Sequence, residues 1–262
     1  MKTHFIYSLA KTYPQILMPI EKDIRNTEEY KNIVLRGMDT NRVPLFSFDE
    51  RDKFESFKTE VGDVNIITMY QRQDFVHMAQ CLGSRCEPVI IPDSTGAMAI
   101  FGLNNWDKVR ANLDDYKDSI ILLSSGYYSD VTYKDVNKVC GMNLSKDEWI
   151  EKSIIIRKYH ELTHFVMRKK YPDNIKPIRD ELIADALGIK EAFAYFNTKM
   201  LKLFLGLENN EYRQGGRLQN YEGGTIDNIP VVLKQIDELE ERINKYKDSS
   251  IEYIWAHIID LM

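Results

Sequence analysis

Short apolar runs alternate with turn residues through the first 140 residues of the chain. Each run is four to six residues long and is bounded by Gly, Pro, Asp or Ser, a pattern typical of strands. The predicted strands are Val64–Met69, Pro88–Ile91, Ala97–Phe101 and Ser119–Leu123. Between them the pattern predicts helices around Gln73–Cys81 and Trp106–Leu113. We therefore expect residues 1–140 to form a mixed α/β half with a small sheet.

From about Ser145 onward the pattern changes to that of long helices. Ser145 and Glu148 form a capping-box pattern, in which each side chain accepts a hydrogen bond from the other residue's backbone N–H. The helix should run to about Tyr171, because Pro172 blocks its continuation. Its apolar stripe, at helical spacing, consists of Ile155, Tyr159, Leu162 and Val166.

A second long helix is expected to begin at Pro177 and to continue toward Leu205, with Gly206 as its stop. A glycine-rich loop follows at 214–224. Two more helices are predicted at Val231–Tyr246 and Ile251–Met262. Residues 141–262 should therefore form a helical half.

The predicted fold class is α+β, in which the mixed half at 1–140 can belong to the same domain as the helical half at 141–262. In the helix at Val231–Tyr246, the apolar positions follow an alternating spacing of four and three. Such spacing can form a dimer seam, but a stripe this short favours packing on the chain's own core. The stripe consists of Val232, Ile236, Leu239, Ile243 and Tyr246. The sequence leaves the oligomeric state open.

The composition is that of a folded globular protein, since 44% of the 262 residues are hydrophobic, 29% are charged and the net charge is −5. Lys and Arg are spread along the chain, so no nucleic-acid partner is expected. The apolar runs are too short to cross a bilayer, and no signal-peptide pattern is evident at the N-terminus, so no membrane association is expected. Three cysteines, an odd number, do not suggest a disulfide framework. We expect a cytoplasmic protein.

The segment His160-Glu-Leu-Thr-His164 falls in the middle of the first predicted long helix. The two histidines are one helical turn apart, so both imidazoles leave the same face and can bind one cation. Glu161 is rotated by about 100° from His160, which places its carboxylate beside a metal rather than on it. A base in that position can take a proton from water at the metal.

Glu181 and Asp185 lie one turn apart in the next predicted helix. After the histidines the first helix descends about 10 Å to its end, and the second climbs back about 6 Å from Pro177 to Glu181. An antiparallel pair therefore returns Glu181 to the level of the histidines. Beyond the two acids this face becomes small, at Gly188 and Ala192, so the helices can approach closely. This arrangement favours Glu181 as the third metal ligand over a solvated acidic face.

The pattern HELTH at 160–164 followed by ELIAD at 181–185 resembles that of the gluzincin metallopeptidases, which pair HExxH with a downstream Glu-x-x-x-Asp. The resemblance implies a zincin-like fold that binds Zn²⁺. It implies His160, His164 and Glu181 as the ligands. It also implies Glu161 as the base and Asp185 as the residue that orients a ligand histidine. The 17-position step from His164 to Glu181 is on the short side for that group.

The stretch from His160 to Tyr221 is more closely similar to an uncharacterised family of bacterial HExxH proteins. Those proteins also carry elements like Pro92–Ala97, Gly102–Trp106 and Gly216–Tyr221. The similarity covers about half of the chain. It implies a shared site but no known substrate.

The glycine-rich loop carries polar side chains that are candidates for catalysis. A hydrolase needs a donor opposite the metal to stabilise the developing oxyanion, and Tyr or Arg can supply it. Tyr221 and Arg217 are the candidates, with Arg213 beside them. The alternative role of these residues is to cap helix ends or to pair with surface acids.

The sequence therefore favours a zinc-dependent hydrolase that acts on a peptide or small amide. One alternative is a non-haem Fe²⁺ oxygenase, which uses the same two-His-one-carboxylate set, with Arg213 or Arg217 holding a carboxylate co-substrate. Another is a non-catalytic regulator in which the metal joins two helices. Glu161 argues against the regulator, because a structural site needs no base. The substrate and the physiological metal are not encoded in any pattern that we find.

Overall fold

The computed structural model describes residues 24–32, 36, 46–84, 89–101, 119–174, 176–209, 211–221 and 229–262. The chain divides into two compact units, Met1–Lys58 with Gly62–Ser125, and Thr59–Val61 with Gly126–Met262. A small sheet dominates the first unit and helices dominate the second, which confirms the predicted α+β class. The division at residue 140 stays a prediction. The helix expected at Trp106–Leu113 and the motif at Gly102–Trp106 lie outside the described residues.

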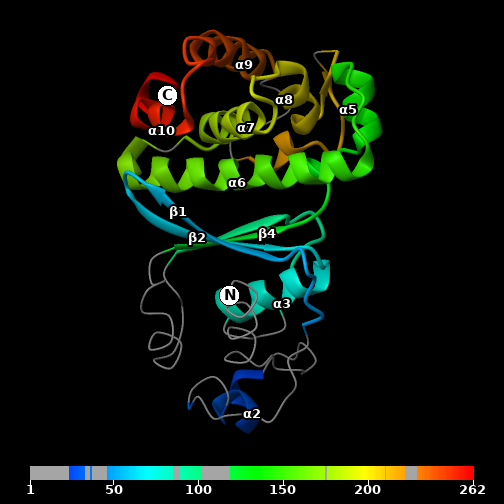
Figure 1. The fold of residues 1–262 in the computed structure, drawn as a ribbon, viewed down its shortest axis with the longest axis vertical. Coiled ribbons are helices and arrows are strands. Elements are labelled where there is room, and N and C mark those ends of the chain that lie inside the picture. The colour runs from blue at the N-terminus through cyan, green and yellow to red at the C-terminus, as the bar shows by residue number, and fades with distance from the viewer. Residues whose placement is uncertain are drawn as a thin grey trace. The chain divides into compact units, whose positions relative to one another are not determined.

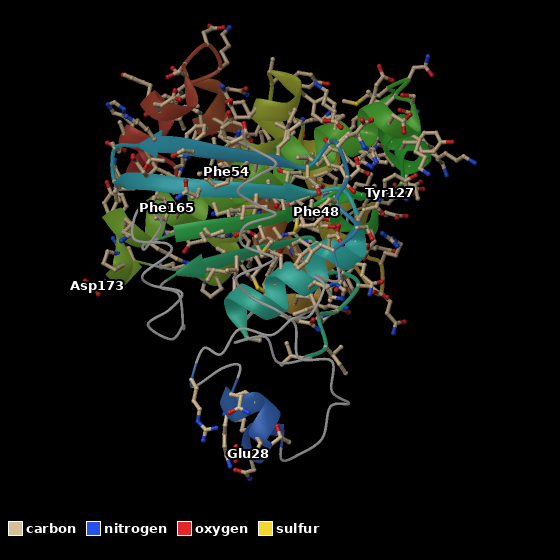
Figure 2. All side chains as sticks on the ribbon, turned by 60° about the horizontal axis from the view of Figure 1, so that its bottom comes forward. Glu28, Phe48, Phe54, Tyr127, Phe165 and Asp173 are labelled. Carbon is tan, nitrogen blue, oxygen red and sulfur yellow. The ribbon has the colours of Figure 1, made fainter. Side chains whose placement is uncertain are left out.

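The sheet of the first unit has four strands in the order β1-β2-β4-β3. They are β1 (Lys53–Thr59), β2 (Gly62–Met69), β3 (Ala97–Phe101) and β4 (Ser119–Ser124). The central strands β2 and β4 are parallel, with Asn65 opposite Ile120, and β3 is antiparallel to β4. Figure 2 shows the four strands side by side. The strands predicted at Val64–Met69, Ala97–Phe101 and Ser119–Leu123 are confirmed.

The strand predicted at Pro88–Ile91 is wrong over its described residues, which form no strand. The carbonyl oxygen of Val89 accepts a hydrogen bond from the side chain of Gln80 (2.8 Å) instead of from a neighbouring strand. Ile90 is 81% exposed, so an apolar run here buries little surface. Conversely, β1 is not predicted, because this edge strand carries charged residues among its partly exposed aromatic ones.

Helix α3 (Arg72–Gly83) covers one face of this sheet and confirms the helix predicted at Gln73–Cys81. Its buried residues Phe75, Met78 and Leu82 pack in one cluster with Ile67 and Leu122 of the central strands. Phe48 and Phe54, labelled in Figure 2, pack against the same cluster. The described part of this unit also contains η1 (Ile24–Asn26) and α2 (Glu28–Tyr30).

The second unit begins with η4 (Tyr128–Asp130) and α5 (Tyr133–Cys140). The following elements are α6 (Lys146–Lys170), η5 (Pro172–Asn174), α7 (Pro177–Phe193), α8 (Thr198–Leu205), β5 (Leu207–Glu208), β6 (Glu211–Tyr212), η6 (Arg217–Asn220), α9 (Ile229–Asn244), α10 (Ile251–Ala256) and η8 (Ile258–Asp260). Figure 1 shows α7 alongside α6, with α9 on the opposite side of α7.

Helix α6 begins and ends where the sequence predicts. The Ser145 hydroxyl accepts a hydrogen bond from the backbone N–H of Glu148 (3.3 Å), and the Glu148 carboxylate accepts one from the backbone N–H of Ser145 (2.8 Å). This is the expected capping box. The helix ends at Lys170, before Pro172.

The single helix predicted from Pro177 to Leu205 is wrong, because the chain breaks it into α7 and α8. Ala194 adopts a left-handed backbone conformation (φ 65°) that ends α7. Asn197 then caps α8, since its side chain accepts a hydrogen bond from the backbone N–H of Met200 (3.1 Å). Gly206, with φ 78°, ends α8 as predicted.

Val232, Ile236, Leu239 and Ile243 of the predicted stripe are buried on α9, which confirms that it packs on the chain's own core, whereas Tyr246 lies beyond the helix and is only half-buried. The helix predicted at Ile251–Met262 ends earlier, at Ala256, because His257 leaves the helical region (φ −110°) before η8. None of the helices in the described ranges is long and apolar enough to span a bilayer.

Candidate metal centre

Two adjacent helices bring the three predicted metal ligands together. His160 and His164 lie on α6, and Glu181 lies in the second turn of α7. His160 Nε2 is 3.1 Å from His164 Nε2 and 3.5 Å from Glu181 Oε2, while His164 Nε2 is 3.2 Å from Glu181 Oε1. The described part of the chain thus contains a His-His-Glu group able to bind a metal ion.

The spacing of these atoms fits a tetrahedral cation. A zinc ion that binds nitrogen at about 2.0–2.1 Å holds its tetrahedral ligand atoms about 3.3 Å apart. The observed separations of 3.1, 3.2 and 3.5 Å lie around that value. Both imidazoles are buried, and two imidazole nitrogens that face a carboxylate across so short a distance are typical of a metal site.

Asp185 fixes the orientation of His160. Its Oδ1 lies 2.7 Å from His160 Nδ1, and the carboxylate is almost completely buried. An Nδ1–H that donates to Asp185 leaves the lone pair on Nε2, the nitrogen that faces His164 and Glu181. This contact agrees with the role that the gluzincin resemblance implies for Asp185, and that role toward a metal ligand stays a prediction.

Tyr128 is a residue of the centre that the sequence does not predict. Its hydroxyl donates to Asp185 Oδ1, and its oxygen is 3.0 Å from His160 Nδ1. Tyr128 lies 32 positions before His160 in a short 3₁₀ segment, where no apolar period predicts a long-range contact.

Arg217 lies in the glycine-rich loop, at the start of η6, and bridges Glu181 and Asp185 of α7. Its Nη1 donates to Asp185 Oδ1 (3.2 Å) and to Ser129 Oγ (3.0 Å), and its Nη2 donates to Glu181 Oε2 (3.3 Å). Its guanidinium also stacks over the ring of Tyr128, 5.1 Å from the centroid. A catalytic role for Arg217 stays a prediction, and its contacts here are those of a residue that orients the carboxylates.

The charges around the centre keep Glu181 and Asp185 ionised. Burial alone would raise the pKa of Glu181, but the hydrogen bond from His164 and the charges of His160, His164 and Arg217 hold this pKa well below its ordinary value. Burial would likewise raise the pKa of Asp185, but Arg217 and the hydrogen bond from His160 lower it. The carboxylates are therefore in the form that a cation requires.

The pKa of His160 moves in the opposite direction. Burial lowers it, but the hydrogen bond to Asp185 and the negative charges of Asp185, Glu181 and Glu161 outweigh burial and raise it above the ordinary value of 6.5. In the metal-free protein, His160 therefore holds its second proton to a higher pH than a free imidazole, and a cation competes with that proton.

A family model described as "Family of unknown function (DUF7005)" matches residues 2–113 and 110–247. The chain belongs to this family. The second matched segment includes both ligand helices, α6 and α7, and the loop with Arg217. Nothing matches the chain among curated proteins or among solved structures. The DUF7005 description assigns no activity, so the chemistry of the centre rests on its geometry.

Tyr221 lies at the end of η6, next to Arg217. Its ring is 5.7 Å from the guanidinium of Arg217, and its hydroxyl is buried without a hydrogen-bond partner of good geometry among the described residues. Burial raises the pKa of Tyr221, and the nearby carboxylates of Asp185 and Glu181 add to this effect against the charge of Arg217. The phenol is thus a protonated donor close to the ligand Glu181.

Glu161 and Arg213, the other two candidates, differ in their surroundings. Glu161 is half-buried on α6, and no described residue forms a hydrogen bond or an ion pair with its carboxylate. Its charge still acts on His160, whose pKa it helps to raise. Arg213 is about half exposed and forms an ion pair with Glu208 (2.9 Å). Pairing with a surface acid is the alternative role that the sequence allows for Arg213.

Proposed function

We propose that this DUF7005 protein is a zinc-dependent hydrolase that acts on a peptide or similar amide. The observation that carries the proposal is the spacing of His160, His164 and Glu181, next to a carboxylate, Glu161, that pairs with no residue in the described part of the chain. Two imidazole nitrogens and one carboxylate are the donor set of catalytic zinc sites, in which the fourth position stays open. The gluzincin-like HExxH and Glu-x-x-x-Asp patterns support the same proposal.

When bound, zinc would supply a Lewis acid that polarises a carbonyl group and makes water more acidic. Glu161 would accept the proton of the attacking water and later deliver it to the leaving amine. Glu161 is half-buried, and no cation among the described residues pairs with its carboxylate, so its oxygens are available to a water molecule.

The Tyr221 hydroxyl would donate a hydrogen bond to the oxyanion that develops on the substrate. The buried hydroxyl lies close to Glu181 but has no hydrogen-bond partner of good geometry among the described residues, so its proton is available to a substrate oxygen. Arg217 is less suited to this task, since both of its terminal nitrogens already bond to Asp185, Glu181 or Ser129. We therefore assign Tyr221 to the substrate and Arg217 to the orientation of the carboxylates.

The same donor set would also bind Fe²⁺, as in non-haem oxygenases. That function needs a cation to hold a carboxylate co-substrate, and Arg217 and Arg213 are both engaged with acids of the chain. In a regulator in which the metal only joins α6 and α7, Glu161 would have no chemical role, because a structural site needs no base. The contacts therefore favour the hydrolase.

The test is Glu161→Gln, which keeps the three ligands and the size of the side chain but removes the proton acceptor. Metal content, measured by elemental analysis of protein purified without added metal, should be one zinc per chain in both forms. Hydrolysis of a peptide mixture, followed by mass spectrometry, should fall by about 10²–10⁴-fold, as for the loss of a general base. Glu151→Gln, an exposed position on the same helix, is the matched control.

Three outcomes contradict the proposal in different ways. Iron instead of zinc in the purified protein favours the oxygenase. Zinc with no cleavage of any peptide by the wild type favours the structural role. Zinc with equal cleavage by the wild type and Glu161→Gln removes Glu161 from the mechanism.

A further inference from the structure

Tyr128 reaches the metal centre from outside the two ligand helices. Its side chain is only 5% exposed, and its hydroxyl is enclosed with Asp185 and His160. The hydroxyl donates to Asp185 Oδ1 and lies 3.0 Å from His160 Nδ1. One phenol thus contacts both members of the pair that sets the tautomer of His160.

The Asp185 carboxylate is held unevenly. Its Oδ1 accepts from His160, Tyr128 and Arg217, whereas its Oδ2 is buried without a hydrogen-bond partner among the described residues. The hydrogen bonds that described residues donate to this carboxylate therefore all act on one oxygen. Because Tyr128 and His160 share that oxygen, the phenol fixes the point toward which the imidazole donates.

The loop that carries Tyr128 has a conformation that is costly for its residues. Ser129 and Asp130 follow Tyr128, are not glycine, and have φ angles of 56° and 58°. Consecutive left-handed residues of this kind persist only where the surrounding structure requires them, and such strain is concentrated at functional sites. Ser129 in turn accepts a hydrogen bond from Arg217 (3.0 Å).

Three buried side chains of α6 hold this loop. Ser153 Oγ accepts from the backbone N–H of Tyr128 (3.1 Å), and Trp149 Nε1 donates to the carbonyl of Val131 (2.8 Å). Arg157 donates to two backbone carbonyls just before Tyr128. The helix that carries both ligand histidines thus also fixes the loop, so Tyr128 keeps a constant position relative to His160.

We propose that Tyr128 is a positioning residue of the metal centre, whose hydroxyl holds the Asp185 carboxylate so that His160 presents Nε2 to the metal. The inference rests on the proposed function only in that it requires metal binding by His160, His164 and Glu181. It adds a fourth chain segment, 126–131, to the two ligand helices and the Arg217 loop. It requires no particular substrate.

Tyr128→Phe tests this role, because it removes the hydroxyl and keeps the ring that packs against Phe204. The affinity for Zn²⁺, measured by competition with a chromophoric chelator, should fall roughly 10-fold, the lower end of the loss for outer partners of a metal ligand. With Co²⁺ in place of Zn²⁺, the visible absorption bands should shift, since they report ligand geometry. Tyr127→Phe, the same change at the neighbouring residue (labelled in Figure 2), should alter neither measurement, because the Tyr127 hydroxyl has no described partner.

A double-mutant cycle separates positioning from general stability. If Tyr128 acts through Asp185, then Tyr128→Phe should cost little further zinc affinity in an Asp185→Ala background. Asp185→Asn replaces Asp185→Ala in the cycle if the alanine variant does not fold. The melting temperature of each variant without metal shows whether the fold itself has weakened.

Each result decides the matter. Stoichiometric zinc in the wild type with unchanged affinity in Tyr128→Phe overturns the inference and leaves the proposed function standing. Equal losses in Tyr127→Phe and Tyr128→Phe, or additive losses in the cycle, also overturn it. A wild-type protein that binds no zinc overturns the proposed function and, with it, this role of Tyr128.

Discussion

The backbone of Gly188 on α7 lies directly against the carbonyl oxygen of Ile156 on α6. A Cβ at Gly188 would lie 2.6 Å from that oxygen and 3.1 Å from the Cγ2 of Ile156. Gly188 is two turns beyond Glu181, and Ile156 is one turn before His160, so this contact sets the separation of the two ligand helices. The small residue that the sequence predicts on this face of α7 therefore allows the two helices to approach closely.

Gly188→Ala should destabilise the protein although alanine is the better helix former. The helical preference gains about 0.5–1 kcal/mol. The clash with the Ile156 backbone costs more, about 1–3 kcal/mol as for other overpacked cores. Zinc affinity should fall as well, because the helices that share the ligands must move apart. Thermal unfolding and chelator competition measure the two effects.

The matched control for this change is Gly83→Ala at the end of α3. There a Cβ would meet only the flexible Sδ of Met98, at 3.2 Å. This variant should leave zinc affinity unchanged. A Gly188→Ala protein that is more stable than the wild type would contradict the close approach of α6 and α7.

Replacing any of the three ligands with alanine should abolish stoichiometric metal binding. His160→Ala, His164→Ala and Glu181→Ala each remove one corner of a group whose atoms lie within 4.8 Å of one another. Metal content after dialysis is the measurement. His257→Ala, which removes a histidine outside the group, should keep full metal. Full metal in Glu181→Ala would show that a different residue supplies the third ligand.

Asp185→Asn should keep the fold and weaken zinc binding roughly 10- to 100-fold, as is typical when a ligand histidine loses its carboxylate partner. The change keeps the shape of the side chain but removes the charge that faces His160 Nδ1 and Arg217. Chelator competition gives the affinity, and Asp173→Asn at an exposed position is the control. An unchanged affinity would reduce Asp185 to a packing role.

In the metal-free protein, stability should depend on pH through Glu181 and His160. The pKa of Glu181 is lowered from 4.5, so its contribution to stability is present above pH 4.5 and is lost as pH falls through the lowered pKa. The pKa of His160 is raised from 6.5, so its contribution is complete below pH 6.5 and is lost as pH rises through the raised pKa. The pair should therefore stabilise the metal-free fold most between these two values.

The free energy of unfolding is measured for the wild type and for Glu181→Gln in excess chelator. The difference between the two free energies gives this contribution. The difference should be largest between pH 4.5 and 6.5 and should shrink on both sides. Zinc affinity should show the opposite trend on the alkaline side. A cation needs neutral imidazoles, so zinc should bind more tightly as pH rises through the pKa of His160. A difference that does not vary with pH would mean that the two residues do not interact in solution.

The sequence predicts the ligand helices well because their signals are local. Ser145 and Pro172 bound α6, Pro177 begins α7, and one helical period relates His160 to His164. The position of Glu181 follows from the helical rise alone once the two helices are antiparallel. The sheet strands β2, β3 and β4 are found for the same reason, because each is an apolar run between turn residues.

The missed features depend on distant contacts or on unusual local backbone. Ala194 ends α7 in a left-handed conformation, for which an alanine gives no sequence signal. Tyr128 meets Asp185 across 57 positions, and the η4 segment shows no period that indicates this contact. The bonds of Arg217 to Glu181 and Asp185 likewise join residues 36 and 32 positions apart. Such pairings follow from the packing of the whole unit.

The short connection between the ligand helices has a consequence for the order in which the centre assembles. His164 and Glu181 are 17 positions apart, so closing that loop in a flexible chain costs about 2.5 kcal/mol beyond a constant. Closing the 57 positions between Tyr128 and Asp185 costs about 3.6 kcal/mol on the same scale. During folding, a cation can therefore gather α6 and α7 while the chain before them is still unstructured. We expect the contact of Tyr128 with Asp185 to form after the ligand helices have met, because it closes the longer loop, and to narrow the orientations of His160 only at that stage.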